Sequence, residues 1–476
     1  MISLSNLNLY LFLLLIAFLR VAVSSNVALG VDEAHYVLYG LNPALSYFDH
    51  PPLVGWTQAL FINIFGDGEL GVRVSAIIIG FFSSLLIYKL IFKISNSVKS
   101  SVISAIALNA SFMFNALFFM LLPETILFML LVPIILVTLN IDKEPSLKNW
   151  LILGLLMGIA GLTKYTAILF VIPIAIYFVV QKKYSYFLSF GFFVSIIVAL
   201  ILVSPVILWN MQNEWISFSY QSEHVVGDTH IDWRVFAQSV AAQFGAYNPF
   251  LWILSFYGLF KAVTSKDKTL FLSALFGITL LLFFWYASLY KRALPHWSAL
   301  FYYIFIPIGT YYMYKGSKRA KKYLNFSIIF GLVVTLILYL ELIFKFIPLS
   351  DYNSPHRDIY GWDRIMQQAN ELLKPNEALA VTNWTVASRA IYYNRNHNSE
   401  LFLVDNNRYD QFDIWNSKSP INRDLIFINT HFFKEPIALK FRCDSVKKLK
   451  SFNINLNGSK VNSIELIECK NFKGYR

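Results

Sequence analysis

The sequence predicts a polytopic α-helical membrane protein that ends in a small extracytoplasmic α/β domain. Three observations lead to this fold class. The 476-residue chain is 57% hydrophobic with a mean hydropathy of +0.53, which is more apolar than a soluble domain. Apolar stretches of about 20 residues recur, and each is long enough to cross a bilayer core of roughly 30 Å. After residue 347 the composition turns polar and rich in Asn and Asp.

The hydropathy pattern predicts eleven membrane spans. We place them at 7–29, 70–93, 100–118, 121–140, 150–163, 166–181, 186–209, 247–264, 269–288, 297–314 and 323–347. The stretch 1–20 lacks the basic start of a cleaved signal peptide, so we interpret it as a retained first span.

Basic residues are distributed unequally between the two sets of loops. Five fall in one set, namely Arg73, Lys164, Arg234, Lys291 and Arg292. Fifteen fall in the other, namely Lys89, Lys93, Lys99, Lys143, Lys148, Lys182, Lys183, Lys261, Lys266, Lys268, Lys315, Lys318, Arg319, Lys321 and Lys322. The positive-inside rule predicts that the richer set is cytoplasmic. The N-terminus is then cytoplasmic, and the loop 30–69 and the tail lie outside. The formal charge of +12 is explained by these loops, so we exclude nucleic acid as a partner.

Two domains follow from this pattern, a transmembrane domain over 1–347 and an extracytoplasmic α/β domain over 348–476. In the second, "WDRIMQQANELL" has helical periodicity, and "ALAVTNW" and "DLIFINT" are typical of strands. Cys443 and Cys469 both fall there. A disulfide and two free thiols are both compatible with the sequence.

The first outer loop is unusually rich in ionisable residues, with Asp32, Glu33 and His35 in "VDEAHY" and Asp49 and His50 in "SYFDHPP". We expect Asp32 at the end of the first span, where a rigid helix fixes its position. Adjacent helical residues point about 100° apart, so one acid can face a cavity while the other pairs or caps. The two prolines forbid a helix at their position, and "LVGWTQALFINIF" then predicts an interfacial helix.

Further polar residues are predicted on the same outer side. Lys164 and Tyr165 lie between two short apolar segments, and basic residues on an outer face require an anionic partner. The others are Glu124, Glu223, His224, Lys291, Arg292 and His296. Together they predict an outward cavity with carboxylates and cations that opens to lipid. No nucleotide-binding motif or zinc framework occurs, so no nucleotide cofactor is expected.

The order "DEAHY", "YFDHPPLVGW", "FGDGELGVR", "LTKYTA", "SPVILWNMQNEWISFSYQSEH" and "LYKRALPHW" resembles the family 39 type membrane glycosyltransferases. These include protein O-mannosyltransferases and the lipid A aminoarabinose and hexosamine transferases. The resemblance implies the GT-C fold, an extracytoplasmic active site in the bacterial inner membrane and a polyprenyl-phosphate sugar donor such as an undecaprenyl phosphate sugar. The implied activity is transfer of a hexosyl or pentosyl group to lipid A or another cell-envelope glycolipid. Protein O-glycosylation and, in another class, a transporter or flippase of lipid-linked sugars are the alternatives.

The resemblance also assigns roles to single residues. Asp32 resembles the catalytic acid, with Glu33 beside it. Lys164, Tyr165, Lys291, Arg292 and His296 resemble donor-phosphate contacts. Asp49 and His224 resemble ligands of a divalent cation (Zn²⁺, Mn²⁺ or Mg²⁺), and His50, Glu124 and Glu223 line the same loop region. This chain has His50 where relatives often carry Lys, and Glu124 where many carry Asp.

Overall fold

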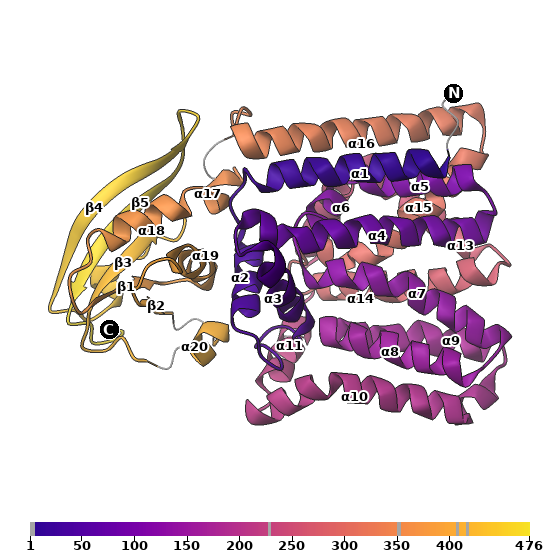
Figure 1. The fold of residues 1–476 in the computed structure, drawn as a ribbon, viewed down its shortest axis with the longest axis horizontal. Coiled ribbons are helices and arrows are strands. Elements are labelled where there is room, and N and C mark those ends of the chain that lie inside the picture. The colour runs from indigo at the N-terminus through magenta and orange to yellow at the C-terminus, as the bar shows by residue number, and fades with distance from the viewer. Residues whose placement is uncertain (1–4, 227–229, 350–353, 406–408, 416–417) are drawn as a thin grey trace.

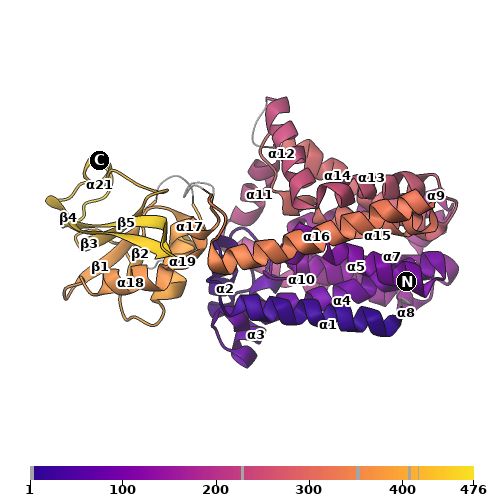
Figure 2. The same cartoon turned by 90° about the horizontal axis from the view of Figure 1, so that it is seen from above.

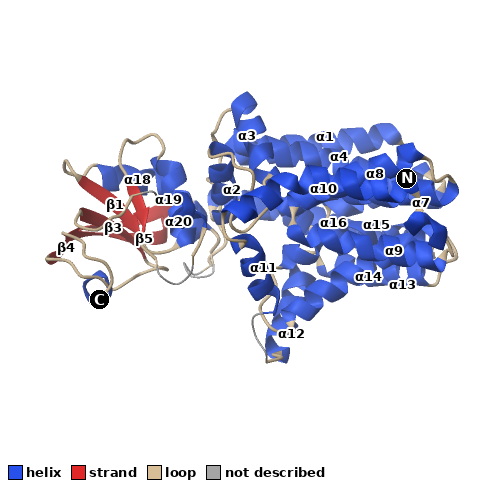
Figure 3. Ribbon diagram, turned by 90° about the horizontal axis from the view of Figure 1, so that it is seen from below, coloured by secondary structure: helices blue, strands red, loops and turns tan. Residues whose placement is uncertain are grey.

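A bundle of long helices forms one part of the molecule, and a sheet domain caps one end of it (Figure 1). The computed structural model describes residues 5–226, 230–349, 354–405, 409–415 and 418–476. Views from above and below place the sheet domain beyond the same end of the bundle (Figures 2 and 3).

Within the described chain, six helices are long and apolar enough to cross a membrane: α1 (Asn6–Ser24), α4 (Glu69–Ser95), α7 (Pro123–Lys143), α10 (Phe190–Gln212), α14 (Lys268–Ser288) and α16 (Lys318–Phe344). Shorter helices complete the bundle: α5 (Val98–Asn109), α6 (Phe112–Leu117), α8 (Leu147–Thr163), η1 (Tyr165–Phe170), α9 (Val171–Val180), α13 (Pro249–Val263) and α15 (Ala299–Lys315). Every expected span coincides with one or two of these helices, which confirms the polytopic helical fold.

The first and third spans differ from the prediction. Helix α1 ends at Ser24, and Asp32 and Glu33 belong to the first turn of a separate helix, α2 (Val31–Leu41). The expectation that Asp32 ends the first span is therefore wrong. The chain can turn between the two helices because Arg73 binds the carbonyl oxygens of Ser24, Val27 and Ala28.

The third span is interrupted between α5 and α6. The side-chain amide of Asn115 donates to the Asn109 carbonyl oxygen (2.7 Å), which would otherwise accept a backbone bond of a continuous helix.

The loops lie at two opposite ends of the bundle. The basic connections α4–α5, α7–α8, α13–α14 and α15–α16 gather at the end that also holds the N-terminus (Figure 1). A short helix, η2 (Tyr184–Leu188), joins α9 to α10. The other end carries α2, α3 (Leu53–Phe65), α11 (Ile216–Val226), α12 (Trp233–Ala246), η3 (Pro295–Ser298) and the sheet domain.

The C-terminal domain is a five-stranded mixed sheet of order β2-β1-β3-β5-β4. Its strands are β1 (Glu377–Val381), β2 (Leu401–Leu403), β3 (Asp424–Thr430), β4 (Ser445–Leu456) and β5 (Ser459–Lys470), and its helices are α17 (His356–Ile359), α18 (Trp362–Asn370), α19 (Trp384–Asn394), α20 (Gln411–Trp415) and α21 (Ile437–Lys440). Strand β1 pairs in parallel with β2 and β3, and β5 is antiparallel to β3 and β4. This confirms the small α/β domain, although the β4–β5 hairpin was not among the predicted strands.

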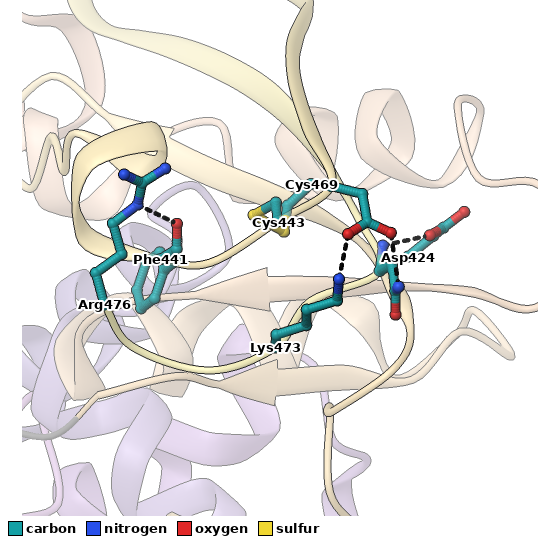
Figure 4. The surroundings of a disulfide bond; sticks show 8 residues. Asp424, Phe441, Cys443, Cys469, Lys473 and Arg476 are labelled. Carbon is teal, nitrogen blue, oxygen red and sulfur yellow. Dashed lines mark hydrogen bonds and ion pairs between the residues drawn. A yellow bond between two sulfur atoms is a disulfide. The ribbon is translucent and has the colours of Figure 1, made fainter.

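A disulfide between Cys443 and Cys469 joins the residue just before β4 to the end of β5 (Figure 4). Beside it, Asp444 forms an ion pair with Lys473 and accepts a hydrogen bond from the Asn471 amide (2.7 Å). The Cys443–Cys469 disulfide, which the sequence left open, is therefore present.

Candidate active site

Helix α2 gives its two adjacent acids different environments. Glu33 is buried and accepts two hydrogen bonds from Arg73, at 2.7 Å from Nε to Oε1 and at 2.8 Å from Nη2 to Oε2. It also accepts from the backbone N–H of Gly30 (2.9 Å) and so caps the helix. Since a buried bidentate ion pair uses both carboxylate oxygens, Glu33 is fixed as a structural tie between α1, α2 and α4.

The carboxylate of Asp32 differs from that of Glu33 in its hydrogen bonding. No hydrogen bond or ion pair within the described chain reaches it, although it is largely enclosed by protein. Burial raises its pKa and repulsion from Glu124 adds to this, while the charges of His296 and His35 act against the shift. A partly buried carboxylate with a raised pKa and free oxygens is suited to accept a proton from a bound substrate.

The turn between α2 and α3 carries Asp49, and this carboxylate is held by two side chains of α2. The hydroxyl of Tyr39 donates to Asp49, and His35 Nε2 lies 3.7 Å from Asp49 Oδ2. Burial alone would raise the pKa of Asp49, but the charges of His50 and His35 and the hydrogen bonds lower it below its usual range. Asp49 therefore stays ionised.

His50 is half-buried next to Asp49, with its ring edge-on to Tyr36 (5.5 Å between ring centres). Burial lowers the pKa of its imidazole, while the Asp49 carboxylate acts against this shift. Its Nδ1 atom has no hydrogen-bond partner among the described residues. Buried polar atoms are nearly always paired, so this nitrogen is a candidate contact for a ligand.

Glu124, Lys164 and His296 form a second polar group, contributed by three parts of the bundle. Lys164, which caps the end of α8, forms an ion pair with Glu124 in the first turn of α7. His296 Nε2, from η3, lies 3.9 Å from the same Glu124 oxygen. An ammonium group has three donors, so Lys164 can bind Glu124 and still offer donors to an anion.

Three other predicted phosphate contacts are Tyr165, Lys291 and Arg292. The Tyr165 ring packs on Phe218 of α11 with 5.4 Å between ring centres. Lys291 and Arg292 precede η3 on the connection from α14, and Arg292 is exposed. The structure therefore places them at the same end of the bundle as Asp32 (Figure 1).

Glu223 and His224 lie on α11, but their side chains are outside the described residues. Among the described residues, no group of three or more His, Cys, Asp and Glu side chains could hold a metal ion. The divalent-cation site assigned to Asp49 and His224 thus stays a prediction.

Three side chains that contact the candidate site were not assigned to it from the sequence, namely His35, Tyr39 and Arg73. His35 and Tyr39 are four residues apart, a spacing that places them on one helix face and could have linked them to each other. Arg73 was counted only as a basic loop residue, because no local sequence pattern indicates an ion-pair partner 40 positions away.

In α1, the buried Arg20 donates to Asn109 (3.1 Å) and Asn115 (3.0 Å), which ties the interrupted third span to the first.

The comparisons with known proteins agree with this arrangement. The structure is similar to ArnT from Cupriavidus metallidurans bound to undecaprenyl phosphate, with a TM-score of 0.70, 12% identity and coverage of 97% of this chain and 98% of that chain. The apo state of the same protein gives a TM-score of 0.66. The fold is therefore the GT-C-type membrane fold, with a C-terminal sheet domain.

Two sequence comparisons point in the same direction. The profile of the family "Dolichyl-phosphate-mannose-protein mannosyltransferase" matches residues 49–209. The lipid A galacturonosyltransferase RgtD of Rhizobium johnstonii is 22% identical over 243 residues, which is 50% of each protein. The chain thus matches about half the length of this curated relative. The resemblance inferred from the sequence motifs is confirmed by these matches.

Proposed function

We propose that this chain is a glycosyltransferase that moves a sugar from a polyprenyl-phosphate carrier to an acceptor outside the cytoplasm. The observation that carries the proposal is the free Asp32 carboxylate beside the Glu124–Lys164–His296 group, at a bundle end that matches a protein solved with undecaprenyl phosphate. A base and an anion-binding group at a membrane surface are the two elements that this reaction requires.

In the proposed reaction, an acceptor hydroxyl oxygen attacks the anomeric carbon of the donor sugar. Asp32 accepts the hydroxyl proton while the bond from the anomeric carbon to the phosphate oxygen breaks. That electron pair leaves with the polyprenyl phosphate, and the product is inverted at the anomeric carbon. If the acceptor is a lipid phosphate, little deprotonation is needed and Asp32 orients the acceptor.

The leaving phosphate gains negative charge, which fixed cations can stabilise. Lys164 is the central candidate, because it is held in place by Glu124. Lys291 and Arg292, which precede η3 in sequence, are further candidates, and Nδ1 of His50, without a partner among the described residues, offers another polar contact.

Lipid A or another cell-envelope glycolipid is the acceptor that the relatives favour. RgtD is named for galacturonosyl transfer to lipid A, whereas the matching family is named for transfer of mannose to protein. Protein O-glycosylation is therefore the second candidate. Mass spectrometry of lipid A, surface glycans and glycoproteins from cells with and without the gene tests both. Loss of a sugar from lipid A supports the first candidate, and loss from a protein supports the second. If no glycoconjugate changes while lipid-linked sugar accumulates, the chain is a flippase instead.

We place the chain in the bacterial inner membrane with the N-terminus in the cytoplasm and residues 348–476 outside. The separation of basic loops at one end and a disulfide at the other supports this orientation. A reporter that is active only in the cytoplasm is expected to be silent when fused after Arg476 and active when fused in the loop at Lys266. The reverse pattern would overturn both the orientation and the site.

Lys164 and Arg292 are expected to be needed for turnover. Lys164→Met and Arg292→Ala should each cost about 3–4 kcal/mol of transition-state stabilisation, as the loss of one oxyanion donor does. The measurement is the initial transfer rate of the protein in nanodiscs, divided by the amount of monodisperse enzyme.

Glu124→Gln is the matched variant for Lys164, because it removes the same ion pair but keeps the cation. We expect it to retain more activity than Lys164→Met. If Lys164→Met transfers at a normal rate, Lys164 only balances the charge of Glu124 and is no phosphate contact.

A further inference from the structure

The C-terminal domain reaches back to the turn that carries Asp49. His35 Nδ1 lies 3.2 Å from the Ser388 hydroxyl of α19. The backbone N–H of Phe48 donates to Gln411 Oε1 of α20 at 2.7 Å. All four side chains are buried, with Ser388 at 0% and Gln411 at 2% exposure. Two residues from a separate domain therefore bind α2 and the turn that follows it, and both contacts precede Asp49 in sequence.

A chain of hydrogen bonds connects Ser388 to Asp49. The Tyr39 hydroxyl has one proton and donates it to Asp49, so its oxygen accepts from His35 Nε2 (3.0 Å). The Ser388 hydroxyl donates its proton to the Trp384 carbonyl oxygen (2.9 Å), so its oxygen is the acceptor for the other ring nitrogen, Nδ1. Ser388 consequently fixes the orientation of the imidazole, and the imidazole fixes the Tyr39 hydroxyl on Asp49.

Apolar packing accompanies these polar contacts between the two domains. Ala34 and Val37 of α2 belong to one buried cluster with Ala387 and Ala390 of α19. The ring of Trp384 stands edge-on to His35 at 5.5 Å between ring centres. Domain motion is expected unless an interface is large and hydrophobic, so this packing favours a fixed position of α19 on α2.

We propose that the C-terminal domain is a structural part of the active site, in which Ser388 and Gln411 act as positioning residues for the 46–52 turn. Ser388 acts through His35 and Tyr39 on the Asp49 carboxylate, and Gln411 acts on the backbone at Phe48. The consequence for catalysis rests on the proposed function, whereas the positioning itself does not. The domain thus completes the site instead of binding a separate partner.

Hydrogen–deuterium exchange of the full-length protein in nanodiscs tests the positioning directly. Gln411→Met removes the acceptor of the Phe48 amide, and Ser388→Ala removes only a hydroxyl. Each is expected to speed exchange in peptides covering 46–52 by about tenfold, the effect of one lost hydrogen bond. Ser388→Thr, which restores the hydroxyl, should return exchange toward the original rate.

Tyr392→Phe is the matched control, because its hydroxyl binds the Asp67 carbonyl oxygen (2.5 Å) at the same interface but away from this turn. It should leave exchange in 46–52 unchanged. Unchanged exchange in both Ser388→Ala and Gln411→Met overturns the proposal. An equal increase in Tyr392→Phe also overturns it, because the effect would then reflect general loosening of the domain.

Kinetics separate positioning from binding. With the sugar donor identified by mass spectrometry, Ser388→Ala should lower kcat about tenfold and leave KM for the donor within about twofold. A rise in KM at constant kcat would overturn a positioning role.

Binding of undecaprenyl phosphate to the unsubstituted protein provides the separate test of function. If the protein does not bind undecaprenyl phosphate, while hydrogen exchange in 46–52 still changes with both substitutions, the proposed function is wrong and the positioning role stands.

Discussion

Asp32→Asn is expected to lower the rate of sugar transfer by about 10²-fold or more, as losses of a general base usually do. The substitution keeps the size of the side chain but removes its charge and basicity. No hydrogen bond or ion pair of Asp32 within the described chain is lost, so the fold should be unaffected. The measurement is the initial transfer rate at equal amounts of monodisperse protein. A normal rate in Asp32→Asn would remove Asp32 from the reaction.

The pH dependence of transfer provides a second readout for Asp32. A general base must be deprotonated, and burial raises the pKa of this carboxyl. We therefore expect the acid limb of the rate profile to lie above the usual Asp pKa of about 3.9. The limb should disappear from the residual activity of Asp32→Asn. Its persistence would assign the limb to another group.

Glu33→Gln is expected to destabilise the protein rather than stop the chemistry. It leaves the Arg73 guanidinium buried, at 1% exposure, without its carboxylate. Removal of one partner of a buried ion pair costs about 3–5 kcal/mol. Thermal unfolding in nanodiscs should show a lower midpoint than for Asp32→Asn, while the folded fraction keeps most of its specific activity.

Arg73→Gln is the control for this pair, because it breaks the same contact from the other side. It also leaves the carbonyl oxygens of Ser24, Val27 and Ala28 without their donor, so it should be at least as destabilising. If Glu33→Gln is stable but inactive while Asp32→Asn is active, the roles of the two acids are reversed.

The membrane helices could be predicted from sequence because hydropathy is a local property. Every expected span coincides with one or two helices, and the composition change near residue 347 predicted the separate C-terminal domain. The breaks in the first and third spans could not be predicted, since they depend on Arg73 and Asn115 taking backbone carbonyl oxygens. Partners that lie far apart in the sequence do not change the local hydrophobic periodicity.

The candidate site was predictable as a list of residues but not as a set of contacts. The sequence named Asp32, Glu33, Lys164 and Glu124, yet not that Glu33 pairs with Arg73 or that Lys164 pairs with Glu124. Ser388 and Gln411 were not foreseen, because more than 350 residues separate each of them from its partner in the loop. Only folding brings these groups together.

The release of undecaprenyl phosphate by the purified protein tests the central claim most directly. The protein in nanodiscs would receive an undecaprenyl-phosphate-linked sugar and lipid A, and the lipid products would be quantified by mass spectrometry. We expect undecaprenyl phosphate and glycosylated lipid A to appear in equal amounts, only with both substrates present, and Asp32→Asn to reduce both by about 10²-fold. If Asp32→Asn forms both products at the rate of the unsubstituted protein, the assignment of the reaction to this site is contradicted.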